Sequence, residues 1–163
     1  MPNRKAEDIM TRELVTFTPE TDLYEAMSVL LSRRFSGASV VDSAGILVGV
    51  LSERDCLRVI AGELFEGLPE GRVGDYMSRD LVTVSPSTSL FDIVALFLNR
   101  PIRRLPVVDE DARLVGQISR RDVLWAIESM REHYLYPKQE HELDTKDDGP
   151  GGVSSAMKKA RRL

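Results

Sequence analysis

The sequence predicts an α+β fold in which two tandem β-α-β-β-α repeats pack on each other with pseudo-two-fold symmetry, followed by a C-terminal tail. Three observations predict this fold: an internal duplication, the same order of strands and helices in each copy, and a change of composition after Tyr136. Because neither copy alone could bury a large core, the two copies are expected to pack on each other.

The duplication is visible as segments that recur in the same order. When Asp8 is placed on Asp75, the two halves align without a gap from Ala6 to Leu57. Three segments of the first copy then fall on identical segments of the second: Leu14-Val15-Thr16 on Leu81-Val82-Thr83, Val40-Val41-Asp42 on Val107-Val108-Asp109, and Leu47-Val48-Gly49 on Leu114-Val115-Gly116. Self-similarity over so long a period is typical of a duplicated structural unit.

A short strand and a helix are expected at the start of each copy. Leu14 to Phe17 contains β-branched residues and is followed by Pro19, which ends a strand. Thr21 is then expected to cap a helix, and Thr88 to cap the same helix in the second copy. The apolar residues of both helices follow helical spacing: Leu23, Ala26, Met27, Leu30 and Leu31, and again Leu90, Ile93, Val94, Phe97 and Leu98.

A hairpin and a second helix complete each copy. The expected strands are Ala38 to Val41 and Ile46 to Leu51 in the first copy, and Leu105 to Val108 and Leu114 to Ile118 in the second. The second helix starts after Ser52 and again after Ser119. Gly116 lies inside an expected strand, where glycine marks a bulge or the close approach of another segment.

The chain divides into four predicted segments: residues 1–61 for the first copy, 62–72 for a linker, 73–136 for the second copy and 137–163 for the tail. The linker is rich in Gly, Glu and Pro, which favours a loop. The tail gathers acidic residues from Glu140 to Asp148 and ends in the basic segment Lys158 to Arg162. This composition predicts a flexible tail.

Composition predicts a globular cytoplasmic protein. Hydrophobic residues make up 42% and charged residues 29% of the chain, and the net charge of −4 gives no basic field that favours nucleic acid. The longest uncharged stretch, Leu81 to Phe91, contains Ser, Thr and Pro, so no membrane span is expected. The single cysteine, Cys56, cannot form an internal disulfide, which favours a reducing compartment, and it is expected to be a small buried hydrophobe.

The repeated motifs closely resemble those of paired cystathionine-β-synthase (CBS) domains. Each copy has a Met-Thr/Ser start, a Leu-Val-Thr strand, a Pro-x-Thr/Ser helix start, a Val-Val-Asp turn, a Leu-Val-Gly strand and a Ser-x-x-Asp ending, over about residues 6 to 130. The resemblance implies a regulatory module without catalytic residues or cofactor. It also implies a regulatory ligand (AMP, ADP, ATP or S-adenosylmethionine), a homodimer formed through the helices, and an effector protein in trans.

The resemblance implies one ligand site at each Ser-x-x-Asp segment, and the sequence favours the second. Asp122, near a helix start, would accept hydrogen bonds from ribose hydroxyls, although the same motif is typical of a capping box that needs no ligand. The arginines nearby suit phosphate oxygens. The predicted second site comprises Thr83, Arg103, Arg104, Leu105, Pro106, Ser119, Arg120, Arg121 and Asp122.

The first site is predicted to be the weaker one, because it lacks clustered arginines and Glu53 would repel a phosphate. It comprises Thr16, Gly37, Ala38, Ser39, Ser52, Arg54 and Asp55. No spacing of His, Cys or acidic residues predicts a metal site. Two alternatives remain open: a structural protein whose clefts bind no ligand, and nucleic-acid binding through Lys158 to Arg162, for which the mixed charge of the tail is a weak indication.

Overall fold

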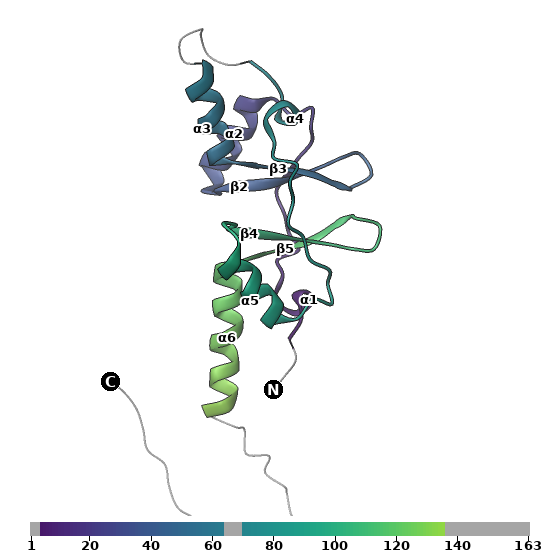
Figure 1. Cartoon of the computed structure of the whole chain (residues 1–163), viewed down its shortest axis with the longest axis vertical. Helices are drawn as coiled ribbons and strands as arrows, with labels where there is room; N and C mark the ends of the chain where they lie inside the picture. Colours follow the sequence, from purple (N-terminus) through teal and green to yellow (C-terminus); the bar gives the residue numbers. More distant parts are fainter. Residues whose placement is uncertain (1–3, 64–69, 136–163) are drawn as a thin grey trace, which may run out of the picture.

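The computed structural model describes residues 4–63 and 70–135, so the predicted tail and most of the predicted linker lie outside the described residues. The elements in chain order are α1 (Ala6–Ile9), β1 (Thr16–Phe17), α2 (Leu23–Arg33), β2 (Gly37–Val41), β3 (Leu47–Ser52), α3 (Glu53–Glu63), α4 (Val73–Tyr76), α5 (Leu90–Asn99), β4 (Arg104–Val108), β5 (Leu114–Ser119) and α6 (Arg120–Leu135) (Figure 1). Among the described helices, none is long and apolar enough to cross a membrane.

Each copy is built around an antiparallel hairpin, β2 with β3 and β4 with β5. In the first copy β1 adds a parallel strand beside β2, and it is shorter than predicted. In the second copy the corresponding segment makes a single bridge, Val84 with Val107, in which the Val84 N–H donates to the Pro106 carbonyl. The adjacent pair, Thr83 with Pro106, would need a backbone N–H on Pro106, which proline lacks. The pairing is therefore limited to one bridge.

The helices α2 and α5 have caps one residue later than predicted. The capping residue of α2 is Asp22, whose carboxylate accepts two backbone N–H groups of the first turn at 2.9 and 3.0 Å. Ser89 caps α5 in the same way. The Thr21 hydroxyl instead accepts the backbone N–H of Thr18 at 3.0 Å, and Thr88 makes the equivalent bond in the second copy. The predicted capping threonines thus hold the turns that precede the helices.

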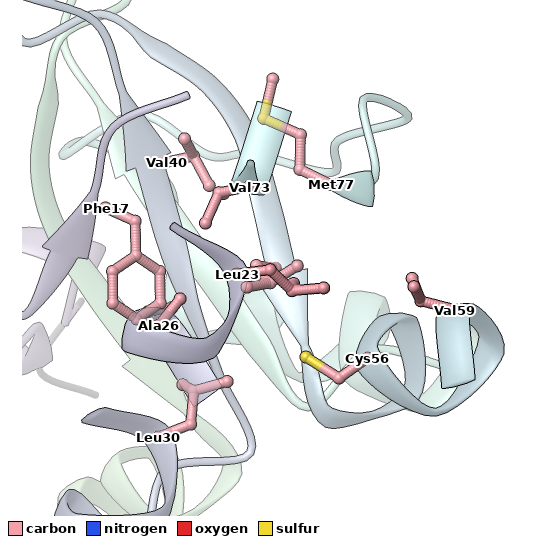
Figure 2. Packing of buried hydrophobic residues seen from close by; sticks show 11 residues of the cluster. Phe17, Leu23, Ala26, Leu30, Val40, Cys56, Val59, Val73 and Met77 are labelled. Carbon is pink, nitrogen blue, oxygen red and sulfur yellow. The ribbon is translucent and has the colours of Figure 1, made fainter. Parts of the chain in front are cut away.

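The two copies exchange their first segments, which the sequence did not predict. The helix α1 is the first element of the first copy, yet its Ala6 is fully buried in the core of the second copy. The helix α4 is the first element of the second copy, and its Val73 is fully buried in the core of the first, where Figure 2 shows it between Val40 and Met77. Each core is therefore completed by the first segment of the other copy.

Backbone hydrogen bonds fix this exchange in the same way on both sides. The Ala6 N–H donates to the carbonyl of Thr88 at 2.8 Å, and the Val73 N–H donates to the carbonyl of Thr21 at 2.8 Å. Two glycines give the segments room: a Cβ on Gly49 would lie 2.8 Å from Cγ of Met77, and one on Gly116 would lie 2.8 Å from Cγ of Met10. Gly116, where the sequence predicts a bulge or a close backbone approach, thus allows the close approach of the Met10 side chain.

The two hairpins contact each other through their turns. The Leu47 N–H donates to the carbonyl of Ala112, and the Leu114 N–H donates to the carbonyl of Gly45, both at 3.1 Å. Because Leu114 and Ala112 are the duplicates of Leu47 and Gly45, the paired bonds confirm the predicted pseudo-two-fold symmetry. The helices α2, α3, α5 and α6 lie on one side of the hairpins, and the turns extend on the other (Figure 1).

Candidate functional site

A cavity of about 550 Å³ lies between the two copies. The inner faces of both hairpins line it, together with the start of α3 and the loops at 78–82 and 101–103. This volume lies within the range of small-molecule sites, and a position between two structural units is typical of such sites.

The cavity joins residues from both predicted sites. From the predicted first site it contains Gly37, Ala38, Ser39, Ser52, Arg54 and Asp55, and from the predicted second site it contains Arg103, Arg104 and Pro106. The sequence predicts these three second-copy residues to lie in one site with Asp122. In the fold, the loop before β4 instead faces the Ser-x-x-Asp segment of the other copy.

Several predicted residues lie outside this cavity. Thr16 and Thr83 have exposed side chains, and the neighbours Leu81 and Val82 line the cavity in place of Thr83. Leu105 is fully buried in the second core, because neighbouring residues of a strand point to opposite faces. The start of α6 also lies outside the cavity, with Ser119, Arg120, Arg121 and Asp122.

Asp55 is the buried carboxylate of the cavity, with 7% of its surface exposed. Its Oδ2 accepts the backbone N–H and the hydroxyl of Ser52 at 2.9 and 2.6 Å, and its Oδ1 accepts the hydroxyl of Ser78 at 3.2 Å. Arg58 lies 3.7 Å from Oδ1 as an exposed ion-pair partner. A carboxylate has about four acceptor positions, so Oδ1 retains capacity for a ligand hydroxyl.

Asp122 forms the same capping box with less support. Its Oδ2 accepts the backbone N–H and the hydroxyl of Ser119, both at 2.7 Å, and no described residue donates to its Oδ1. The capping-box interpretation of the Ser-x-x-Asp motif is thus confirmed in both copies. The copies differ in the hydrogen bond that comes from the other copy. The Ser78 hydroxyl donates to Asp55, whereas its duplicate Thr11 makes no hydrogen bond to Asp122 within the described chain.

Arg104 reaches from the cavity toward the second Ser-x-x-Asp segment. Its guanidinium carbon lies 4.9 Å from the centre of the Phe35 ring. Burial lowers the pKa of Arg104, while the charges of Asp122 and Glu53 raise it, so the group interacts with the start of both α3 and α6. Phe35 and Arg104 are the duplicates of Ile102 and Gly37, which line the cavity on the Asp55 side. The Arg104–Phe35 contact therefore occupies the corresponding space on the Asp122 side.

Arg120 has a different position from the one predicted for phosphate binding. Its Nη2 donates to the carbonyl of Ile102 at 2.9 Å. Ile102 lines the cavity and Arg120 does not, so Arg120 supports a residue of the cavity wall from outside the cavity. The arginines that line the cavity are Arg54, Arg103 and Arg104, and the guanidinium of Arg104 lies over Phe35.

Sequence reasoning missed part of the cavity wall. Ser78, Asp80, Val50, Leu57 and Gln117 all line it. The duplication contained one usable signal, since Ser78 belongs to the repeated Met-Thr/Ser start. The others lie on the side of a strand, helix or loop that only the packing of the two copies brings to the cavity.

The chain resembles known proteins along most of its length. The sequence profile of the CBS domain matches residues 6–62 and 73–129. The crystal structure of CBSX2 from Arabidopsis thaliana in complex with AMP is 33% identical in sequence and has a TM-score of 0.71. The match covers 78% of this chain and 98% of CBSX2. The uncharacterized protein MJ1225 of Methanocaldococcus jannaschii is 30% identical over 135 residues, which make up 79% of this chain and 47% of that protein.

Some relatives are longer than the matched region. Inosine-5′-monophosphate dehydrogenase of Methanocaldococcus jannaschii is 30% identical over 121 residues, which cover 74% of this chain and 23% of that enzyme. The chain thus spans about half the length of MJ1225 and about a quarter of the dehydrogenase. The resemblance to both is confined to this shared region.

Proposed function

This chain belongs to the CBS domain family, and on that premise we propose that it is a regulatory module that binds an adenine nucleotide between its two copies. The observation that carries the proposal is the cavity of about 550 Å³, whose lining includes the buried Asp55 of one copy and arginines of the other. The complex of CBSX2 with AMP supports the choice of AMP as the first ligand to test.

The proposed pose assigns the parts of AMP by chemistry. In this pose Asp55 accepts a hydrogen bond from a ribose hydroxyl, since Asp55 and Ser78 both line the cavity and its Oδ1 accepts one hydrogen bond, from Ser78, within the described residues. The phosphate lies toward Arg54 and Arg103, because guanidinium groups donate two parallel bonds to phosphate oxygens. Binding at the Asp122 side, which the sequence favours, stays a prediction.

AMP is expected to raise the melting temperature of the protein by about 5 to 10 °C when present at about 100 times its Kd. Linkage gives about 2.7 kcal/mol of added unfolding free energy at that concentration, and a domain of this size gains a few degrees per kcal/mol. Differential scanning calorimetry measures the shift, on protein shown by mass spectrometry to be free of copurified ligand. No shift with AMP, ADP, ATP or S-adenosylmethionine at millimolar concentration contradicts the proposal and favours a ligand-free interaction protein.

The proposed output is a change in the relative arrangement of the two copies. A ligand in the cavity contacts both hairpins, and it shifts the population toward whichever arrangement it binds better. A partner protein that recognises this arrangement would receive the signal. The catalytic activity of the dehydrogenase is not part of this proposal, since only 23% of that enzyme is matched. The cytoplasmic location stays a prediction.

The proposed oligomer is a homodimer formed through the helices. Apolar side chains are exposed at the same positions of both copies: Leu31 and Leu98 at 72% and 80%, and Leu57 and Leu124 at 65% and 67%. Phe91 at 81% and Trp125 at 61% extend this surface. These exposed residues belong to α2, α3, α5 and α6, the four helices that lie on one side of the hairpins in Figure 1. Because the exposed positions are duplicated, a second copy of this chain is the partner proposed.

The substitution Leu98→Asp is expected to convert a dimer into a monomer at micromolar concentration, because it adds a charge to the proposed apolar interface. Sedimentation velocity measures the oligomeric state. The control Ser43→Asp adds the same charge in the exposed hairpin turn and is expected to leave the dimer intact. A wild-type protein that sediments as a monomer, or a Leu98→Asp variant that stays dimeric, contradicts this interface.

A further inference from the structure

Ser39 carries a buried hydroxyl that has no hydrogen-bond partner among the described residues. The residue is 3% exposed and lies on β2, the central strand of the sheet β1-β2-β3. A buried hydroxyl without a partner costs stability, and such groups are rare in folded proteins. The hydroxyl therefore needs an explanation beyond the fold.

The strand geometry places the side chain of Ser39 on the cavity side of β2. Ala38 and Val40, its neighbours on β2, belong to the buried core of the first copy. Because alternate residues of a strand point to opposite faces, Ser39 points away from that core, and it lines the cavity. The cross-strand partner of Ser39 is Val50, which lines the same cavity.

Local structure does not explain the choice of serine. The duplicate of Ser39 is Pro106, which lies on β4, in a sheet of two strands. A proline at 39 would remove an N–H from a strand that pairs on both sides, so the fold disfavours proline there. Alanine or valine would keep the N–H and leave no orphaned hydroxyl. The fold thus accounts for the backbone of Ser39 but not for its side chain.

The surroundings of Ser39 suit the base of a nucleotide better than its phosphate. Val50 and Pro106 form apolar walls on the two hairpins, and Gln117, the cross-strand partner of Pro106, adds a second polar side chain. The side-chain amide of Gln117 makes no hydrogen bond within the described part of the chain. Apolar walls with a few polar groups match a flat heterocycle, whose faces are apolar and whose edge forms hydrogen bonds.

We infer that the Ser39 hydroxyl is the specificity group of the cavity and forms a hydrogen bond with the edge of the nucleotide base, an inference that rests on the proposed function. The ligand satisfies a hydroxyl that the empty protein leaves without a partner. Ser39 thus lowers the unfolding free energy of the ligand-free protein and raises its affinity for the nucleotide. The same hydroxyl favours bases with a polar edge over apolar ring systems of equal size, since an apolar ring would leave it unsatisfied.

The test is the substitution Ser39→Ala, with two readouts of opposite sign. AMP affinity, measured by titration calorimetry, is expected to fall about threefold to tenfold, because one neutral hydrogen bond is lost. The urea midpoint of the empty protein is expected to rise, because an unsatisfied buried hydroxyl is removed. Ribose 5-phosphate, which has no base, is expected to raise the melting temperatures of wild type and variant by the same amount.

Controls separate this inference from the proposed function. Ser43→Ala, in an exposed turn, is expected to change neither readout, and Ser39→Thr, which keeps the hydroxyl, is expected to retain more AMP affinity than Ser39→Ala. If wild type binds AMP and Ser39→Ala binds it equally well, the inference is wrong and the proposed function stands. A lowered urea midpoint in Ser39→Ala, or an equal loss of ribose 5-phosphate binding, also overturns the inference. Absence of AMP binding to the wild type overturns both.

Discussion

Replacing Asp55 with alanine is expected to weaken AMP binding by about tenfold to a hundredfold. The carboxylate is buried in the cavity wall, and a hydrogen bond from a ribose hydroxyl to a charged acceptor contributes about 1.5 to 3 kcal/mol. Ser52 and Ser78 lose their acceptor in the same variant, so a loss of about 1 kcal/mol in unfolding free energy accompanies it. Titration calorimetry measures the affinity, and urea unfolding measures the stability.

The matched control is Asp122→Ala, at the duplicate position. It removes the same capping box, with bonds to Ser119, and is expected to cost similar stability while leaving AMP affinity within about twofold. The reason is that Asp122 does not line the cavity, and that Arg104 lies over Phe35 on that side. Loss of AMP binding in Asp122→Ala with none in Asp55→Ala would support the site that the sequence favours and contradict the one proposed from the cavity.

The substitution Ala6→Asp is expected to lower the unfolding free energy by about 3 to 5 kcal/mol, because it disrupts the core of the second copy although Ala6 belongs to the first. The side chain is fully buried in the core of the second copy, so the variant places an unpaired carboxylate among apolar side chains. Urea unfolding followed by circular dichroism measures the change.

Two further variants serve as a matched test and a control for Ala6→Asp. Val73→Asp makes the same change in α4 and is expected to destabilise the first core equally. Glu7→Ala changes the exposed neighbour in α1 and is expected to shift the free energy by less than about 0.5 kcal/mol. Equal midpoints for Ala6→Asp and Glu7→Ala would show that α1 does not pack in the second core.

The fold could be predicted from the sequence because the sequence is duplicated. Helical spacing from Leu23 onward and the Val-Val-Asp turns are local patterns, and each was present twice, so one copy supported the other. Cys56 was expected to be a small buried hydrophobe, and at 5% exposure it is buried in the first core. Burial and the neighbouring charge of Asp55 raise the pKa of its thiol.

Which residues of the two copies lie together in one site could not be predicted in this way. The sequence joined Arg103 and Arg104 to Asp122 because all three belong to one copy. The fold instead brings those arginines and Asp55 to one cavity, because the loop before β4 and the start of α3 both line it. This arrangement depends on how two similar units face each other, and spacing within either unit carries no record of it. The orphaned hydroxyl of Ser39 was equally invisible, since burial and partners are properties of the packed chain.

The exchange of first segments also sets the order in which a growing chain can complete its two cores. The first core can close once Val73 and Met77 have been made, whereas the earlier segment from Ala6 to Thr11 waits for its partners Thr88 and Gln117. At translation rates of about 5 to 20 residues per second, that wait lasts roughly 5 to 20 seconds. During it the first segment of one nascent chain is free to complete the second core of a neighbouring chain. We therefore expect domain-swapped molecules to form when many chains are synthesised close together, and fewer of them when synthesis is slower.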